Sequence, residues 1–403
     1  MSAQFAMPAI VSAIHHLVTE SDLVEEPSAA GTDLGAVFAQ ITDPRDRRGR
    51  RHTLAAILML VQAAVVSGAT TFAAIAHWIG SAPAAVLADC GIRPAPRTGT
   101  VKAPHPDTIS RLLVNLDPAE LDLVYARHRS AQMSQQLHQG DELIGLAVDG
   151  KAMRGTAGDG AQARHRMGAF LHEHAIMVAT CDVDGKTNEI NAFKPLLDQI
   201  TDLENIVVTG DAMHTQRKHA RYLHKRKAHY VFPVAGNQPG LFDQLDALAW
   251  AKIPIGWMTY DRGHGRQEIR TIQTMPAPKN IRFPHARQVF LIERHVHDPA
   301  GKPLSSIAVL GITDLTAAQS GPRRLAELIR GQWSIENRDH YVRDVTFGED
   351  RCRIRAAATP SILATMRSYA ISTLRLLGFT NIAEATRWAR DDFTHPIIAL
   401  RLT

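Results

Sequence analysis

The middle of the chain holds short apolar runs whose order restricts the folds open to it. Residues 142–150 (ELIGLAVDG) form an apolar run that ends in an acid and a glycine, as a buried strand ends. Residues 174–193 predict a strand, a turn at Asp184-Gly185 and a second strand, which together make a hairpin. The runs at 205–211 (NIVVTGD) and 229–236 (HYVFPVAG) predict two further strands.

Helical patterns separate these strands. FKPLLDQITDL has helical spacing, and HTQRKHARYLHKRKA predicts a basic helix. The order strand, hairpin, helix, strand, helix, strand predicts a mixed sheet of about five strands with helices on both faces. From Pro239 to Leu315 a short helix and several alternating strands predict a β-rich insertion. After Pro322 the helical period returns and continues toward the C-terminus.

An uncharged segment at residues 54–80 is long enough to span a bilayer. Polar residues interrupt it, and SGATT reads as a turn between two short buried helices, so we expect no transmembrane helix. The N-terminal sequence lacks the basic region and the cleavage site of a secretion signal. Cys90, Cys181 and Cys352 are widely spaced, which fits a reducing compartment and argues against a structural zinc site. We therefore expect a cytoplasmic protein.

A modest basic excess permits a polyanionic partner, with 45 Lys and Arg residues against 40 Asp and Glu residues. The densest basic run lies just before the apolar helices. Such a run is usually a solvated surface, but beside helices it can also bind phosphates. Its members are Arg45, Arg47, Arg48, Arg50 and Arg51.

Two acids follow predicted strands. Asp149 ends the first apolar run and Asp211 ends the β-branched run at 205–211. Open α/β sheets gather ligands at such strand ends, so the two carboxylates can lie side by side. For either acid alone, turn or helix-cap chemistry is an alternative. Together they repel one another unless a cation lies between them, and a hard ion such as Mg²⁺ suits this role.

A third carboxylate is expected on a helix near residue 336. Glu336, His340 and Arg343 recur with helical spacing and are predicted to share one face, with Trp333 and Ile335 as apolar anchors beside it.

Glu349 is the rival for the third acid. Val345, Thr346 and Gly348 are expected to weaken or end the helix before it, so we assign the role to Glu336.

Several long motifs occur in a fixed order: AVDGKAMRGT, DGKTNEI, VVTGDAMHTQ, VAGNQPGLF, DRGHGRQEIR and WSIENRDHYVRDVTFGEDRCRIR. Together they closely resemble the insertion-sequence DDE transposases of the H-repeat-associated (ISAs-type) family. The resemblance implies a ribonuclease H-like α/β catalytic core with a β-rich insertion, and a metal-binding catalytic triad that falls on Asp149, Asp211 and Glu336.

The resemblance also implies a domain order. It consists of an N-terminal tail (1–34), a helical transposase-associated domain that binds DNA (35–135), the catalytic domain (141–347, with the insertion at about 238–318) and a C-terminal helical region (348–403).

The helix that carries the glutamate departs from related transposases. They show a tyrosine, an arginine, the glutamate and a lysine, where this chain has Ile329, Gln332, Glu336 and Arg343. Arg330 is a candidate for the missing cation. Before the GNQP motif, Ala235 stands where the family pattern predicts a lysine.

The implied activity is DNA strand cleavage and strand transfer with two Mg²⁺ or Mn²⁺ ions. A nuclease without strand transfer and an inactive DNA-binding derivative are the alternatives. Partners are expected to be transposon ends and target DNA, bound by a homodimer or larger assembly at the bacterial nucleoid. The LHEHA sequence lacks zinc-protease spacing and no GxxxxGK[ST] loop is present, so no nucleotide cofactor is expected. The predicted DNA contacts are Arg47, Arg48, Arg50, Arg51, Lys151, Arg154, Arg217, Lys218, Arg221, Arg262, His264, Arg266, Arg330 and Arg343.

Overall fold

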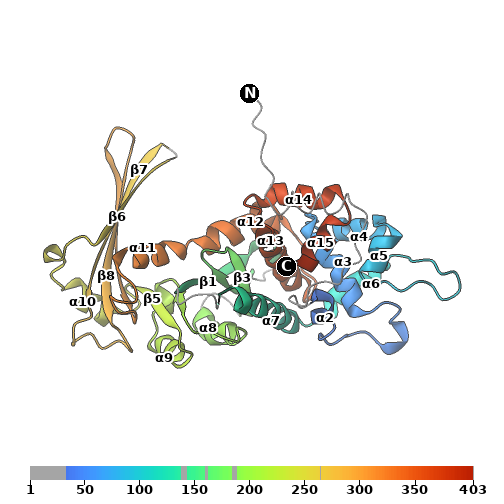
Figure 1. Cartoon of the computed structure of the whole chain (residues 1–403), viewed down its shortest axis with the longest axis horizontal. Helices are drawn as coiled ribbons and strands as arrows, with labels where there is room; N and C mark the ends of the chain where they lie inside the picture. Colours follow the sequence, from blue (N-terminus) through green and yellow to red (C-terminus); the bar gives the residue numbers. More distant parts are fainter. Residues whose placement is uncertain (1–32, 138–142, 159–161, 184–187, 264, 403) are drawn as a thin grey trace.

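The computed structural model describes residues 33–137, 143–158, 162–183, 188–263 and 265–402 (Figure 1). His264 and the predicted turn at Asp184-Gly185 lie outside these ranges.

One sheet of nine strands runs through the molecule, in the order β3-β2-β1-β4-β5-β9-β8-β7-β6. Strand β1 pairs antiparallel with β2 and parallel with β4; β2 and β3 are antiparallel, and β4 and β5 are parallel. This is the ribonuclease H-like arrangement that the sequence predicted. The five strands are β1 (Ile144–Met153), β2 (Arg164–Leu171), β3 (Ile176–Val183), β4 (Ile206–Thr209) and β5 (His229–Val234).

The predicted hairpin was misplaced. The hairpin is formed by β2 and β3, and residues 189–193, predicted as its second strand, begin helix α8 (Glu189–Leu197). Phe193, Leu196 and Leu197 are fully buried on one side of this helix. Their spacing of three and four residues suits a helix, and burying that face outweighs the local strand pattern.

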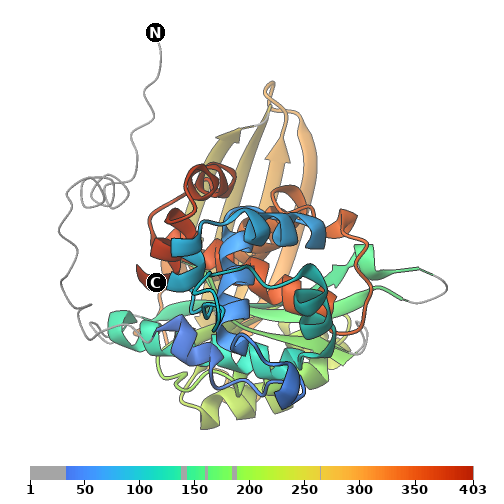
Figure 2. The same cartoon turned by 90° about the vertical axis from the view of Figure 1, so that its right-hand side faces the viewer.

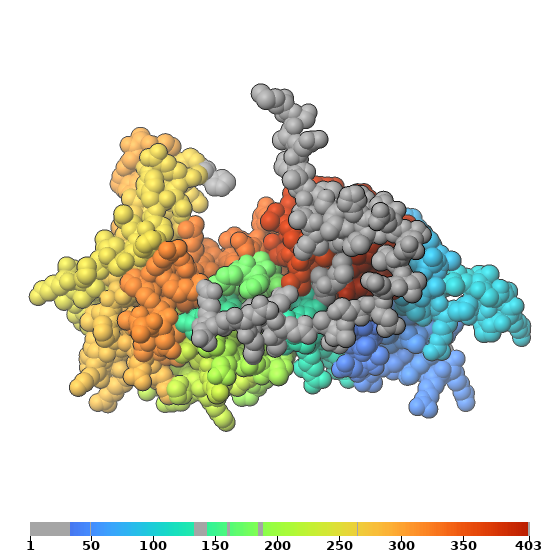
Figure 3. All heavy atoms as spheres, viewed as in Figure 1, coloured from blue at the N-terminus to red at the C-terminus, as the bar shows by residue number. Residues whose placement is uncertain are grey.

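The predicted β-rich insertion extends the same sheet, because β9 pairs antiparallel with β5. The outer ends of these strands form an arm that stands away from the body, shown in yellow and orange in Figure 3. The strands are β6 (Trp257–Gly263), β7 (Arg266–Pro276), β8 (Gln288–His297) and β9 (Pro303–Thr313), preceded by helix α10 (Pro239–Asp246).

Helices cover both faces of the sheet, as predicted. On one face Val208 and Tyr230 pack with α8 and α9 (Arg217–Lys225); on the other Val207 and Val231 pack with α11 (Pro322–Gly331). Neighbouring strand residues point to opposite faces, so each strand contributes to both layers.

The N-terminal and C-terminal helices share one core at the end opposite the arm (Figures 1 and 2). The segment tested as a membrane span forms two helices joined by a turn, as predicted. No helix in the described part of the chain has the length and apolar character needed to cross a bilayer. The helices are α2 (Leu34–Phe38), α3 (Leu54–Val66), α4 (Phe72–Ser81), α5 (Ala84–Asp89), α6 (Pro106–Asn115), α7 (Pro118–Leu137), α13 (Thr359–Leu376), α14 (Ile382–Asp391) and α15 (His395–Leu402).

Candidate active site

Asp149 and Asp211 come from adjacent parallel strands. Register pairs Ala147 of β1 with Thr209 of β4. Continuing that register by two residues places Asp149 opposite Asp211, which follows the end of β4. Asp211 caps a short helical turn, where its Oδ1 accepts a hydrogen bond from the Met213 N–H at 3.0 Å. The side chain of Asp149 is largely buried and that of Asp211 is about half exposed.

Glu336 approaches from the helix that continues α11. The neighbouring Ile335 is fully buried in a cluster with Ala147, Phe170 and Met177, whereas Glu336 is exposed. The apolar anchor is therefore Ile335. Trp333, predicted as a second anchor, is 63% exposed.

Gln332 fixes this helix to both catalytic strands. Its Nε2 donates to the Val148 carbonyl at 3.1 Å, and its Oε1 accepts from Thr209 Oγ1 at 2.6 Å. Val148 precedes Asp149 directly, and Thr209 lies two residues before Asp211. The residue that departs from the related transposases therefore joins the three acid-bearing elements.

The three acids interact electrostatically. Burial, together with the carboxylates of Glu336, Glu189 and Asp211, raises the pKa of Asp149 to about 7, although the hydrogen bond from the Gly150 N–H opposes this shift. His340 Nδ1 lies 3.7 Å from Asp149 Oδ2, and burial lowers the pKa of this histidine well below its usual value. His340 is therefore neutral near pH 7 and leaves the acidic charge uncompensated.

The three carboxylates suit a hard divalent cation, because carboxylate oxygens are the ligands that Mg²⁺ prefers. A bound cation would also relieve the repulsion between the carboxylates, which helps to raise the pKa of Asp149. Within the described ranges, no three His, Cys, Asp or Glu side chains already stand close enough to hold one ion. The three acids are therefore not close enough together in this structure to bind one ion jointly.

A buried polar chain lies behind the acids. Glu189, 3% exposed, hydrogen-bonds His165, and its Oε2 lies 3.9 Å from His214 Nε2, which is 4.0 Å from Asp211 Oδ1. A methyl group at Gly150 would clash with both Glu189 and His165, so glycine permits this approach. The quoted motifs contain Gly150, Glu189 and His214 but not His165, and only tertiary packing brings these residues together.

The structure corrects two expectations for the helix. Residues 336–340 form a π-helical turn before α12 (Tyr341–Val345), so Glu336 and Arg343 do not share a face. Arg343 is 2% exposed and donates from Nε and Nη2 to Glu349 at 3.0 and 2.6 Å. Its side chain is engaged inside the protein, which is incompatible with the expected DNA contact.

Glu349 is committed to this pair. Gly348, with φ of 59°, follows the end of α12 and turns the chain, in keeping with the expected break. Arg343 and Arg367 outweigh the burial of Glu349 and lower its pKa to about 2.

The remaining basic candidates differ in their surroundings. Lys151 is 8% exposed and binds Asp344 at 2.6 Å, so it too is engaged internally. Arg330 binds Asp261 of the arm at 3.0 Å. Arg217 donates to the Arg282 carbonyl.

Lys218 donates to Asn191 Oδ1 at 3.2 Å, and the Arg262 guanidinium lies 5.2 Å from the Tyr260 ring centroid. The structure leaves other predicted DNA contacts exposed, and they are Arg47, Arg48, Arg51, Arg154, Arg221 and Arg266.

Arg50 supports the turn that carries the N-terminal arginines. Its Nη2 donates to the Asp43 carbonyl at 2.9 Å and also to the Arg45 carbonyl. Arg50 therefore has an internal role that Arg47, Arg48 and Arg51 do not share.

The sequence matches two family models and several known proteins. The family model described as "Transposase DDE domain" matches residues 140–371, and the model described as "DDE_Tnp_1-associated" matches residues 36–128. YncI of Escherichia coli O157:H7 is 27% identical, with 83% of this chain and 85% of that protein covered. The H repeat-associated YhhI of E. coli K12 is 26% identical, with 83% and 88% covered. Both are named as transposase candidates.

Among solved structures, the piggyBac transposase synaptic complex with hairpin DNA matches with a TM-score of 0.40 at 11% identity, covering 92% of this chain and 78% of that one. The transposase DDE model matches more than half of the chain, and this sequence match identifies the family. The chain belongs to the DDE transposase family.

Proposed function

We propose that this chain cleaves DNA at the ends of a bacterial insertion sequence and joins the freed 3′-hydroxyl to target DNA, with Asp149, Asp211 and Glu336 as the catalytic acids. The observation that carries the proposal is the parallel register of β1 and β4, which sets Asp149 opposite Asp211. Gln332 and Ile335 hold the Glu336 helix against the same strands.

In this mechanism Asp149, Asp211 and Glu336 would hold Mg²⁺ or Mn²⁺. The ions, when bound, supply charge stabilisation for the in-line displacement at the scissile phosphate. Gln332 keeps the helix and both strands in fixed relation, so the acids are positioned before DNA arrives. His214 Nε2 lies 4.0 Å from Asp211 Oδ1, with Glu189 behind it. The reaction takes place in the cytoplasm, on nucleoid DNA.

The assay that separates cleavage from transfer uses a duplex with a free 3′-hydroxyl at its element end, together with plasmid target DNA. Joined product in Mg²⁺ supports a transposase. Cleavage of an uncut duplex without joining identifies a nuclease, and DNA binding without either reaction identifies an inactive derivative. The proposed assembly as a dimer or larger complex can be measured on the same DNA by light scattering.

Metal binding is expected to depend on pH. Because the folded pKa of Asp149 is about 7 and its ordinary value is 3.8, this group favours the folded state below pH 4, and that contribution is lost as the pH rises through 7. Mg²⁺ binds the ionised acids, so at one hundred times its Kd at pH 8 it should stabilise the protein by about 2.7 kcal/mol at that pH. The same Mg²⁺ concentration should stabilise it less at pH 6, where Asp149 is mostly protonated. Thermal unfolding with and without Mg²⁺ measures this. An equal Mg²⁺ effect in Asp149→Asn would contradict the assignment.

The exposed N-terminal arginines are expected to bind DNA backbone. Replacing Arg47, Arg48 and Arg51 with Ala should weaken binding of all duplexes and lower the slope of log affinity against log salt by about 0.9 for each phosphate that is no longer bound. Fluorescence anisotropy in EDTA across a salt series measures the slope, since phosphate binding needs no metal. Arg50→Ala is kept separate because its side chain supports the turn. An unchanged slope would identify the run as a solvated surface.

A further inference from the structure

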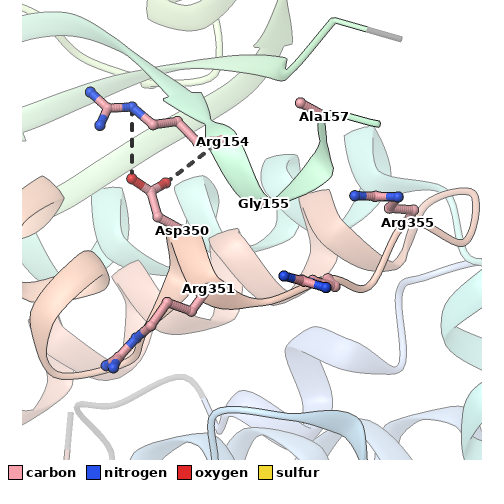
Figure 4. Close-up of a pocket in the computed structure, with 7 residues that line it drawn as sticks. Arg154, Gly155, Ala157, Asp350, Arg351 and Arg355 are labelled. Carbon is pink, nitrogen blue, oxygen red and sulfur yellow. Dashed lines mark hydrogen bonds and ion pairs between the residues drawn. The ribbon is translucent and has the colours of Figure 1, made fainter. Parts of the chain in front are cut away.

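A cavity of about 670 Å³ lies where β1 ends, and none of the three acids lines it (Figure 4). Two segments far apart in sequence form it: the turn at 154–157 that follows β1, and residues 350–355 that follow the catalytic helix. Its lining residues are Arg154, Gly155, Ala157, Asp350, Arg351, Arg353 and Arg355.

Close backbone contact holds the two segments together. The Arg154 N–H donates to Asp350 Oδ1 at 3.2 Å, and Arg154 Nε lies 3.8 Å from Asp350 Oδ2. A methyl group at Gly155 would clash with the Cys352 carbonyl, and one at Gly158 would clash with the Arg355 guanidinium. Gly155 and Gly158 therefore let the segment at 350–355 lie close against the turn that follows β1.

The charge of this cavity is unbalanced. Four guanidinium groups line it with one carboxylate, and that carboxylate already binds Arg154. Among the described residues, no carboxylate lies within ion-pair distance of Arg351, Arg353 or Arg355. All three arginines are exposed. A guanidinium group presents paired N–H donors that can bind two phosphate oxygens at once. An anionic phosphodiester is therefore the matching ligand.

The position of the cavity relates it to the catalytic acids. Arg154 follows Asp149 by five residues, at the start of the turn that follows β1, so the two residues are at most about 17 Å apart at about 3.3 Å per residue. Phosphates of one DNA strand recur about every 3.4 Å along the helix axis. This upper limit corresponds to about five nucleotides.

We propose that Arg351, Arg353 and Arg355, with Arg154, form a pocket for DNA backbone phosphates about five nucleotides from the phosphate that is cut. This inference rests on the proposed function, because it assumes that DNA is the substrate. It adds three residues to the DNA-binding surface, and it gives the segment after the catalytic helix a role in aligning the DNA strand.

The test replaces Arg351, Arg353 and Arg355 with Ala and measures binding of a fluorescent 30-base-pair duplex of random sequence in EDTA. Removing the binding of two phosphates should lower the salt slope by about 1.8 and weaken binding at 0.1 M salt about 60-fold. The matched control removes three exposed arginines from the C-terminal helices α14 and α15, Arg387, Arg390 and Arg401. Replacing the pocket arginines with Lys should retain most of the slope, because the charge remains.

The outcomes separate the two proposals. If the wild type binds DNA and the pocket variant has the same slope, or if the control variant is weakened as much, the pocket proposal is wrong and the proposed function stands. If the wild-type protein binds no DNA, both are wrong. Competition by inorganic phosphate at millimolar concentration, with no difference between the variants in DNA binding, would identify a small-anion site and overturn the assignment to DNA.

A second measurement locates the bound phosphate. Duplexes that the wild-type protein cleaves at a defined position are prepared with a single neutral methylphosphonate at successive positions. Wild-type cleavage should fall for substitutions about four to six nucleotides from the cut, by the spacing along β1. The pocket variant should be insensitive at those positions, since its pocket no longer binds the phosphate. Equal sensitivity in both proteins would overturn the proposal.

Discussion

Glu336→Gln is expected to lower the rate of Mg²⁺-dependent DNA cleavage by roughly 10³-fold or more while leaving the folded protein intact. The substitution removes one of three negative charges that meet at the strand ends, and with it a ligand for the metal. Because Glu336 is exposed, the free energy of unfolding should change by no more than about 0.5 kcal/mol. Cleavage at saturating DNA, with thermal unfolding in parallel, measures both quantities. Asp149→Asn and Asp211→Asn should behave in the same way.

Glu327→Gln is the matched control, since Glu327 is an exposed acid on α11, the helix that leads to Glu336. It forms an ion pair with Arg323 at 3.0 Å and lies away from the strand ends, so cleavage should be unchanged. Normal cleavage by Glu336→Gln, together with loss of cleavage in a stable Glu349→Gln protein, would show that the third acid was assigned to the wrong residue.

Asp149 and Asp211 could be predicted to lie together because their positions depend on local patterns. Each follows a short apolar run, and adjacent parallel strands end at the same edge of a sheet. The pairing of β1 with β4 depends on the fold class. The alternation of strands and helices along the sequence predicts that class as well. The break before Glu349 followed equally from local residues, because Gly348 takes the left-handed conformation that ends the helix.

The errors arose where tertiary packing or an irregular turn decides the structure. A single π-helical turn moved Arg343 away from the Glu336 face, and no residue pattern in that segment predicted it. Trp333 was predicted as an anchor from its apolar character, but of the two predicted anchors only Ile335 lies in the buried cluster. The role of Gln332 depends on atoms of two distant strands, so the sequence could show it only as a departure from related proteins.

Glu349→Gln is expected to destabilise the protein by about 3–5 kcal/mol, because it removes the carboxylate that the buried Arg343 binds through Nε and Nη2. Of the described acids, only Asp339, whose Oδ2 lies 3.4 Å from Arg343 Nη1, would remain to balance the guanidinium charge. The folded pKa of Glu349 is about 2 and its ordinary value is 4.5, so its contribution is present above pH 4.5 and is lost as the pH falls through 2. The difference in urea midpoint between variant and wild type should therefore be the same at pH 7 and pH 5. A difference that shrank already between pH 7 and pH 5 would contradict this account.

The destabilisation should also reach the N-terminal helices. Arg367 Nη1 lies 3.3 Å from Glu349 Oε2, and its Nη2 donates to the Thr70 carbonyl at 3.0 Å, in the turn between α3 and α4. Arg367 thus joins the segment after the catalytic helix to the N-terminal region through one buried side chain. Hydrogen exchange should accelerate in both regions in Glu349→Gln but not in Glu336→Gln. If only the residues near Glu349 became less protected, the two regions would be shown to unfold independently, and Arg367 would be a local contact rather than a mechanical link between them.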